Sequence, residues 1–469
     1  MVQSVSREVA SNFSEGIKGS FGAMTMLVLA CWVAVCILSQ RPGIYALGFF
    51  LSAAAIMVLA TIVVVRRYHL AGQRIPFFWL FLSAALLRLV SLLGVPLFED
   101  DYFRYLWDGF QTVTTQDPYT LAPALFFDRD VPEIFEPILS LINYPEIATV
   151  YGPVTEWVFA LGYLVSPGQV WPLQLLAGMA DLGVLLVLYR LGAGNALLFY
   201  AWSPLLLKEF ALTAHPDIFA ILGVFCCIYA LSLRQTLLAG VFLGLGFGAK
   251  VFAILALPYL LTVKWSVKFW AKFMAAFAAT LLAITWWFGT FLIWVPEGLR
   301  AMADSWLFNA GLYLALLKFF EFQTLKYLLL AGFMAYGLVT VLLRLRRLLG
   351  TGSVAVEQEQ GTGWKSAGFG FRGDWLFLVF MLALPVINPW YITWILPFAT
   401  LYPRCWSWAL SYFVLFAYWY GTNAGISGAG SLQLPASVII VEYAAVLVVA
   451  LLAWIISRRL PHYREFGGL

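Results

Sequence analysis

Charged residues are scarce in this 469-residue sequence. Asp, Glu, Lys and Arg together make up 11% of it, while hydrophobic residues make up 62%. An average soluble domain carries about twice that charged fraction, so the composition excludes an ordinary soluble protein. The formal net charge is only +4, and we expect no nucleic-acid partner for a chain with this balance.

Cysteine and histidine are also scarce, and their positions exclude several kinds of site. The five cysteines lie within apolar runs or at the end of one, which argues against a disulfide framework. The three histidines are not clustered and no Cys-x-x-Cys pair occurs, so the sequence has no zinc or haem signature. These patterns therefore require no cofactor.

Apolar runs close to the length of a membrane span are abundant, and the mean hydropathy is +0.87. They predict an all-α polytopic membrane protein with about 12 to 14 transmembrane helices, the first of them uncleaved. Several runs are too short to cross alone unless the helix is broken or covered by neighbours. The predicted spans cover residues 21–39, 44–65, 76–96, 171–190, 195–211, 216–233, 235–249, 251–263, 273–294, 323–343, 375–387, 390–402, 405–421 and 435–457.

Lys and Arg indicate the orientation of these spans, because cytoplasmic loops carry an excess of both. If residues 171–190 cross once, the basic clusters all fall on the inward side: 66–74, 264–272, 344–347 and 458–459. Segment 97–170 then becomes a large outward loop, and its apolar stretch 151–165 must lie along the membrane interface.

The outward loop contains eleven Asp or Glu residues and only two Arg. Acidic loops are easier to translocate, which explains the few basic residues but not three consecutive carboxylates beside a span. A second polar stretch, 351–374, is typical of a flexible inward linker. We expect it to divide a front transmembrane module, residues 1–350, from a C-terminal transmembrane module, residues 375–469.

The three carboxylates belong to Glu99, Asp100 and Asp101, at the predicted membrane–water boundary. Like charges this close raise one another's pKa, and a carboxylate so tuned can act as a general base. Glu99 and Asp101, two residues apart, also permit a divalent cation without requiring one. A solvated helix cap is the alternative interpretation.

Three stretches of the loop carry a resemblance: "EDDYFRYLWDGF", "DPYTLAP" and "INYPEIATVYGP". They resemble the first outward loop of bacterial polyprenyl-phosphate-sugar-dependent glycosyltransferases of the C-type (GT-C) superfamily, nearest to the polyprenol-phosphate-mannose-dependent mannosyltransferases. The chain departs from the family pattern where Tyr151-Gly152-Pro153 replaces Tyr-Pro-Pro and Asp117 replaces Asn. The matching motif residues are Asp100, Asp101, Arg104, Tyr105, Trp107, Asp108 and Gly109.

The resemblance continues along the chain to about residue 400. "YAWSPLLLKEFALTAHPD" is similar to a family element, with Ser203 in place of Asn and with His215 and Asp217 retained. "GLGFGAKVFAILALP" places Lys250 at a break between half-spans, and "INPWYITWILP" resembles a late Pro-Trp-Tyr element.

The resemblance implies a GT-C-like fold with interfacial helices on a catalytic outward loop, in the inner membrane of a bacterium. It implies an inverting transfer of a sugar from a polyprenyl-phosphate donor to a glycan, glycolipid or lipid-linked acceptor. Mannose is the leading candidate for the sugar. Asp101 is the expected base, with Asp100 its competitor, and Lys250 and Arg300 are expected at the donor phosphate. The other expected substrate-binding residues are Glu99, Arg104, Tyr105, Trp107, Asp108, Tyr151, His215, Asp217, Asn388, Trp390 and Tyr391.

Each of these residues also has a plainer interpretation. Lys250 can snorkel toward water, and Arg300 can be a surface arginine. His215 and Asp217 can mark a helix start, and interfacial aromatics such as Trp390 anchor helices in any membrane protein. Two other functions stay open for the whole chain. One is a secondary transporter, which uses broken helices, and the other is a non-catalytic translocase of a lipid-linked sugar.

Overall fold

The structure is a computed structural model that describes residues 2–41, 43, 45–261, 266–288, 307–350, 372–419 and 434–459. The described chain is helical and contains no β-strand, only an isolated bridge between Phe308 and Val386. The all-α prediction is confirmed.

Six helices are long and apolar enough to cross a membrane, or seven if one bent pair counts as a span. This confirms a polytopic membrane protein, whereas 12 to 14 spans stay a prediction because the remaining apolar helices have only 10–17 residues. The six are α1 (Val2–Ser39), α2 (Ala46–Leu70), α7 (Trp171–Arg190), α13 (Val267–Trp286), α16 (Phe322–Gly350) and α22 (Ala436–Arg459).

The shorter elements fill the space between these helices and form the segment 97–170, the predicted outward loop. Those before α7 are α3 (Phe77–Ser91), α4 (Asp101–Thr115), η1 (Pro123–Phe126), η2 (Glu133–Phe135), α5 (Glu136–Ser140) and α6 (Pro153–Val165). Those from α7 to α13 are η3 (Gly194–Ala196), α8 (Leu197–Ala201), α9 (Pro204–Leu206), η4 (Leu207–Leu212), α10 (Asp217–Ser232), α11 (Thr236–Ala249), η5 (Val251–Ala256) and α12 (Leu257–Leu260). Those after α13 are α15 (Gly311–Leu316), α17 (Gly373–Leu382), α18 (Pro389–Ile392), α19 (Leu396–Leu401), α20 (Cys405–Phe413) and η6 (Val414–Tyr418).

A buried ion pair ties α3 to the centre of the bundle. The guanidinium of Arg88 lies 2.7 Å from Asp181 Oδ2 on α7, and the hydroxyl of Tyr200 on α8 donates to Asp181 Oδ1 at 2.6 Å. The guanidinium also donates to the carbonyl of Ala201. Charges in apolar surroundings need such partners, so this cluster holds three helices in one arrangement.

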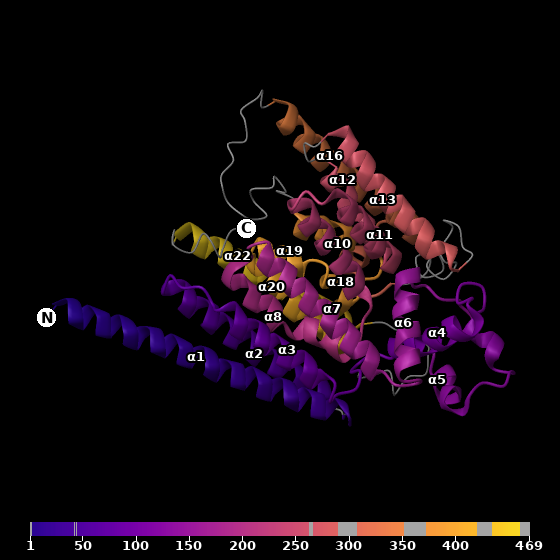
Figure 1. Cartoon of the computed structure of the whole chain (residues 1–469), viewed down its shortest axis with the longest axis horizontal. Coiled ribbons are helices and arrows are strands. Elements are labelled where there is room, and N and C mark those ends of the chain that lie inside the picture. The colour runs from indigo at the N-terminus through magenta and orange to yellow at the C-terminus, as the bar shows by residue number, and fades with distance from the viewer. Residues whose placement is uncertain are drawn as a thin grey trace.

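Residues 97–170, here called the loop module, form a separate group of helices at one end of the molecule (Figure 1). Its own apolar core includes Phe110, Phe135 and Phe159. Gly109 on α4 permits the contact with α6, because a Cβ there would lie 2.4 Å from the carbonyl oxygen of Phe159. The glycine of the Trp-Asp-Gly motif is therefore explained by helix packing.

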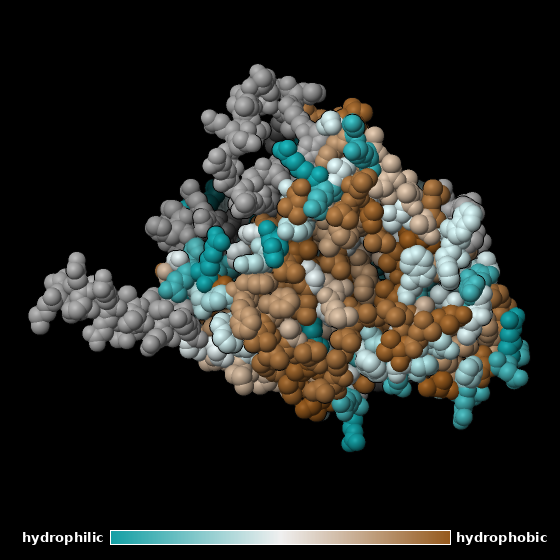
Figure 2. All heavy atoms as spheres, in the orientation of Figure 1, coloured by the Kyte–Doolittle hydropathy of each residue, from teal (hydrophilic) through white to brown (hydrophobic). Residues whose placement is uncertain are grey.

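Apolar side chains cover most of the face of the bundle that Figure 2 shows, and hydrophilic residues gather toward its margins. On α3, for example, Phe78 and Trp79 are 66% and 56% exposed. Such a surface suits contact with lipid chains.

Helix α13 links the loop module to the opposite end of the bundle. At its C-terminal end Phe288 lies 5.4 Å from Tyr119 and 6.2 Å from Trp157, measured between ring centroids. Lys268 lies in the first turn of the helix. Twenty helical residues extend about 30 Å, the thickness of a hydrocarbon core. Lys268 and the loop module therefore lie at opposite ends of a helix that can span.

We expect cysteines placed at Asp130 and at Lys268, in a cysteine-free background, to react with an impermeant thiol reagent from opposite sides of the membrane. The reason is the length of α13 together with the basic residues at its start. The measurement is labelling of intact cells and of inverted vesicles. Reaction of both positions from one side would contradict the predicted topology.

Candidate functional site

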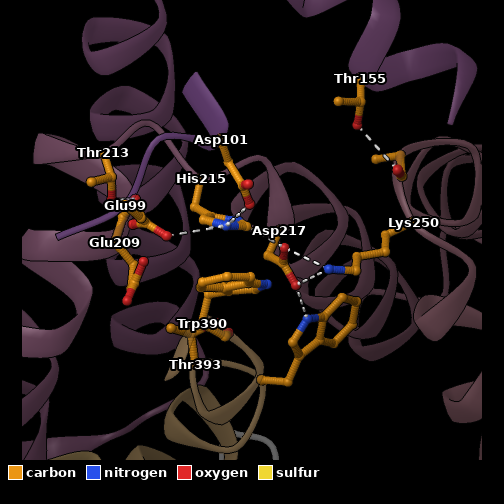
Figure 3. A network of polar contacts seen from close by, with 12 residues as sticks. Glu99, Asp101, Thr155, Glu209, Thr213, His215, Asp217, Lys250, Trp390 and Thr393 are labelled. Atoms are coloured by element: carbon orange, nitrogen blue, oxygen red, sulfur yellow. Dashed lines mark hydrogen bonds and ion pairs between the residues drawn. The ribbon is translucent and has the colours of Figure 1, made fainter. Parts of the chain in front are cut away.

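The site forms where several helices break at the base of the loop module (Figure 3). Helix α11 ends at Ala249, Lys250 is extended, and η5 begins at Val251, as the sequence predicts. The predicted break near Asn388 is also confirmed, because α17 ends at Leu382 and α18 begins only at Pro389. Backbone that leaves the helix frees side chains to converge.

The chain bends by 111° between Pro204–Leu212, which comprises α9 and η4, and α10. The six residues of η4 form a π-helix, a rare conformation that is frequent at functional sites. The hydroxyl of Thr213 donates to the carbonyls of Lys208 and Glu209, at 2.6 and 2.9 Å. The backbone N–H of His215 then donates to the Glu209 carbonyl at 2.8 Å. These bonds hold the turn that carries His215.

His215 is the centre of the site and is only 2% exposed. Its Nδ1 lies 3.2 Å from Asp217 Oδ2, and its ring stacks on Trp390 at 4.2 Å between centroids. Its Nε2 lies 3.9 Å from Glu99 Oε2 and 3.9 Å from Asp101 Oδ2 (Figure 3). The structure thus brings together the acidic motif and the His-x-Asp element, more than a hundred residues away.

Asp217 opens α10, but its carboxylate points to side chains of other elements. Both of its oxygens lie 2.7 Å from Lys250 Nζ, and Trp394 Nε1 donates to Oδ1 at 2.7 Å. The ammonium also lies 4.9 Å from the centre of the Tyr391 ring. Lys250 is therefore paired inside the protein and does not snorkel alone. A lysine has three donors, and a side chain 24% exposed can offer the third to a ligand.

The two neighbouring aspartates differ in their surroundings. Asp100 is the residue before α4, and Asp101 is the first residue of that helix. Asp100 Oδ1 accepts a hydrogen bond from Asn143 at 2.6 Å. Asp101 accepts none from a described residue, and its side chain is 35% exposed.

Burial raises the pKa of Asp101 to about 6, with Glu99 and Asp100 adding to the rise and His215 opposing it. Burial also raises the pKa of Asp100. Burial alone would raise the pKa of Glu99 as well, but Lys208 and His215 hold it below its usual value. A carboxylate with the pKa of Asp101 is largely ionised at neutral pH and can still accept a proton.

Two charged residues of the site, Lys208 and Glu209, were not expected from the sequence. The ammonium of Lys208 contacts Glu99 Oε1 and lies 3.5 Å from Glu209 Oε2 and 4.0 Å above the Tyr418 ring. Both side chains are fully buried. The signal was present, because an ionisable residue within apolar sequence is a functional candidate by default.

The predicted metal pair of Glu99 and Asp101 has a different arrangement in the structure. Ligand atoms of Glu99, Glu209 and His215 lie within 4.8 Å of one another, whereas Asp101 approaches this group only through His215. Glu99 Oε2, Glu209 Oε1 and His215 Nε2 are buried and have no hydrogen-bond partner among the described residues.

The remaining motif residues lie along α4. Tyr105 packs edge-on against His215 at 5.9 Å and Tyr151 at 5.4 Å, measured between ring centroids. Arg104, the residue before Tyr105, donates from Nε to Asp108 Oδ1, one turn further along α4, at 2.7 Å. Trp107 is the exception, because it is fully buried in the core of the loop module and donates to Gln111. The structure gives it a packing role.

Two predictions lie partly or wholly beyond the described residues. Arg300, the second expected phosphate ligand, is outside them. So is most of the linker 351–374, of which only 372–374 is described. The division into modules before and after that linker stays a prediction.

The described site therefore combines an accessible carboxylate, a partly exposed ammonium and a stacked histidine beside apolar helices. Such groups can accept a proton and stabilise an anion. Comparison of the chain with protein-family models, curated proteins and solved structures yields no match.

Proposed function

We propose that this protein is a membrane glycosyltransferase that moves a sugar from a polyprenyl-phosphate donor to an acceptor hydroxyl, with mannose the leading candidate for the sugar. The observation that carries the proposal is the placement of Asp101 and Lys250 on either side of His215. His215 Nε2 lies 3.9 Å from Asp101, while Asp217 joins His215 Nδ1, at 3.2 Å, to Lys250, at 2.7 Å. A base and a phosphate ligand need this kind of separation, because they act at opposite ends of the reacting group.

In the proposed reaction Asp101 accepts the proton of the acceptor hydroxyl as its oxygen attacks the anomeric carbon. The bond between that carbon and the donor phosphate oxygen breaks, and the polyprenyl phosphate leaves with the electron pair. The third donor of Lys250 then faces the developing negative charge, where charge-assisted hydrogen bonds are strong. Arg300 is a second candidate for this role. The single displacement inverts the anomeric carbon.

Further parts of the proposal follow the motif resemblance. The fold is proposed to be GT-C-like with 12 to 14 spans, in a bacterial inner membrane with the loop module outward. The acceptor is proposed to be a glycan, glycolipid or lipid-linked saccharide of the cell envelope. The aromatic side chains of Tyr105, Tyr151, Trp390 and Tyr391 would bind the sugar and the lipid head. Tyr105 and Trp390 contact His215, Tyr151 contacts Tyr105, and Tyr391 lies beside Lys250.

One observation favours a second candidate, a secondary transporter. The 111° bend between η4 and α10 is the kind of broken helix that transporters use at their substrate sites. A transporter or a translocase of lipid-linked sugar would bind a similar ligand but would not cleave it. Cleavage of the donor therefore separates the candidates.

The test uses the full chain in lipid nanodiscs with polyprenyl-phosphate mannose labelled in the sugar, with and without a bacterial envelope lipid extract. We expect labelled product and free polyprenyl phosphate to appear in equal amounts and only when the extract is present. The measurement is thin-layer chromatography with mass spectrometry of both products. Donor left intact in nanodiscs, together with movement of label across proteoliposomes, would contradict a transferase.

A further inference from the structure

We propose that Glu99, Glu209 and His215, here called the metal trio, bind one divalent transition-metal ion, Zn²⁺ or Mn²⁺. The three residues come from the start of the loop module, the π-helix η4 and the turn before α10. Each offers one ligand atom within 4.8 Å of the others. A mixed set of imidazole and carboxylate ligands suits these ions better than Mg²⁺ or Ca²⁺, which prefer oxygen ligands alone.

The unpartnered atoms of the trio support this assignment. Lys208 contacts Glu99 Oε1, and its ammonium lies 3.5 Å from Glu209 Oε2. Glu99 Oε2, both carboxylate oxygens of Glu209 and His215 Nε2 are buried without a hydrogen bond from any described residue. Buried acceptors without a donor are costly, and here they belong to three side chains that meet at one point. A cation would bind one such atom of each side chain.

The distances fit an ion better than direct hydrogen bonds. His215 Nε2 lies 3.9 Å from Glu99 Oε2, which is too far for a hydrogen bond. Bonds from zinc to histidine nitrogen and carboxylate oxygen are about 2.0–2.2 Å, so two ligand atoms of a tetrahedral ion lie about 3.4 Å apart. The pair His215 Nε2 and Glu99 Oε2, at 3.9 Å, needs to contract by about half an ångström to reach that separation.

The surroundings of His215 are those of a metal ligand. Its Nδ1 faces Asp217 Oδ2 at 3.2 Å, so a proton on Nδ1 leaves the lone pair of Nε2 directed to the trio. Such a carboxylate usually orients a metal-binding histidine. Trp390 fixes the plane of the ring by stacking at 4.2 Å.

Carboxyl groups also outnumber lysines around His215, and a divalent ion would offset this excess. Protonated carboxyl groups are the competing explanation, and metal content separates the two. The carboxyl groups that contact His215 or the lysines are Glu99, Asp101, Glu209 and Asp217, and the lysines are Lys208 and Lys250.

The ion would have three protein ligands and an open position, as catalytic metal sites do. Asp101 Oδ2 lies 3.9 Å from His215 Nε2, one of the three ligand atoms. A role for the ion in binding the acceptor hydroxyl rests on the proposed function, whereas binding of the metal does not.

The test measures metal on the full chain in nanodiscs, stripped with a chelator and then dialysed against Zn²⁺ or Mn²⁺ in separate experiments. We expect one ion per chain by mass spectrometry of the element, and a rise in the unfolding temperature on binding. Glu209→Gln and His215→Gln should each weaken binding at least 10-fold, and Asp217→Asn by about 10- to 100-fold. If Glu209→Gln does not fold, Glu99→Gln replaces it.

Glu156→Gln is the matched control. Glu156 is also a fully buried glutamate, but Thr149 and Thr112 donate to its two oxygens, at 2.7 and 2.9 Å. This variant should bind metal like the unmodified chain. No saturable binding of either ion, or equal binding by the trio variants, would overturn the proposal. Sugar transfer by a metal-free chain would refute a role for the ion in the reaction, while the metal site itself is judged by metal content alone. Metal binding without sugar transfer would support the metal site and contradict the transferase.

Discussion

The Asp101→Asn variant is expected to lose about 10²- to 10⁴-fold in the rate of sugar transfer, the usual effect of removing a general base. Asp101 is the carboxylate that accepts no hydrogen bond from a described residue, and its pKa of about 6 keeps it ready to take a proton. The measurement is single-turnover transfer from a labelled donor. Donor binding should persist, because asparagine keeps the shape of the side chain.

Asp100→Asn is the matched variant and should lose less. In the unmodified chain Asp100 is the residue before α4, and its Oδ1 accepts a hydrogen bond from Asn143 at 2.6 Å. If Asp100→Asn is inactive while Asp101→Asn turns over normally, the two roles are reversed. If both variants are active, the acidic motif is structural and the proposed catalysis fails.

The Lys250→Met variant is expected to lower both stability and donor affinity. Without the ammonium, Asp217 keeps contacts to Trp394 and His215 but remains a buried charge lacking its ion-pair partner. Breaking a buried pair costs about 3–5 kcal/mol. Losing a charge-assisted contact to phosphate costs a further factor of about 10 to 100 in donor binding, from about 1.5–3 kcal/mol. Thermal unfolding and donor titration measure the two effects separately.

The double variant Lys250→Met with Asp217→Asn decides what Lys250 does. Removing both charges should restore much of the stability, because no unpaired charge remains buried. If Lys250 binds the donor phosphate, donor affinity stays weak in the double variant. Recovery of donor affinity together with stability would mean that Lys250 only neutralises Asp217.

Local features of the sequence were sufficient to predict the class of protein and the positions at which its helices break. Apolar runs determine the free energy of transfer into lipid, and that quantity depends on composition alone. The break at Lys250 follows a glycine-rich stretch, and the break at Asn388 precedes Pro389. The acidic motif was visible because three adjacent carboxylates stand out in an apolar chain.

Only the tertiary structure decided which charges meet. Glu99 and Lys208 are 109 positions apart, and their contact depends on how the loop module packs against the broken helix. Trp107 and Tyr105 look equivalent in the sequence and both lie in the core of the loop module, yet of the two only Tyr105 also packs against His215. Local propensity sets where helices form, but long-range packing sets which side chains share one buried space, and a buried charge must find its partner there.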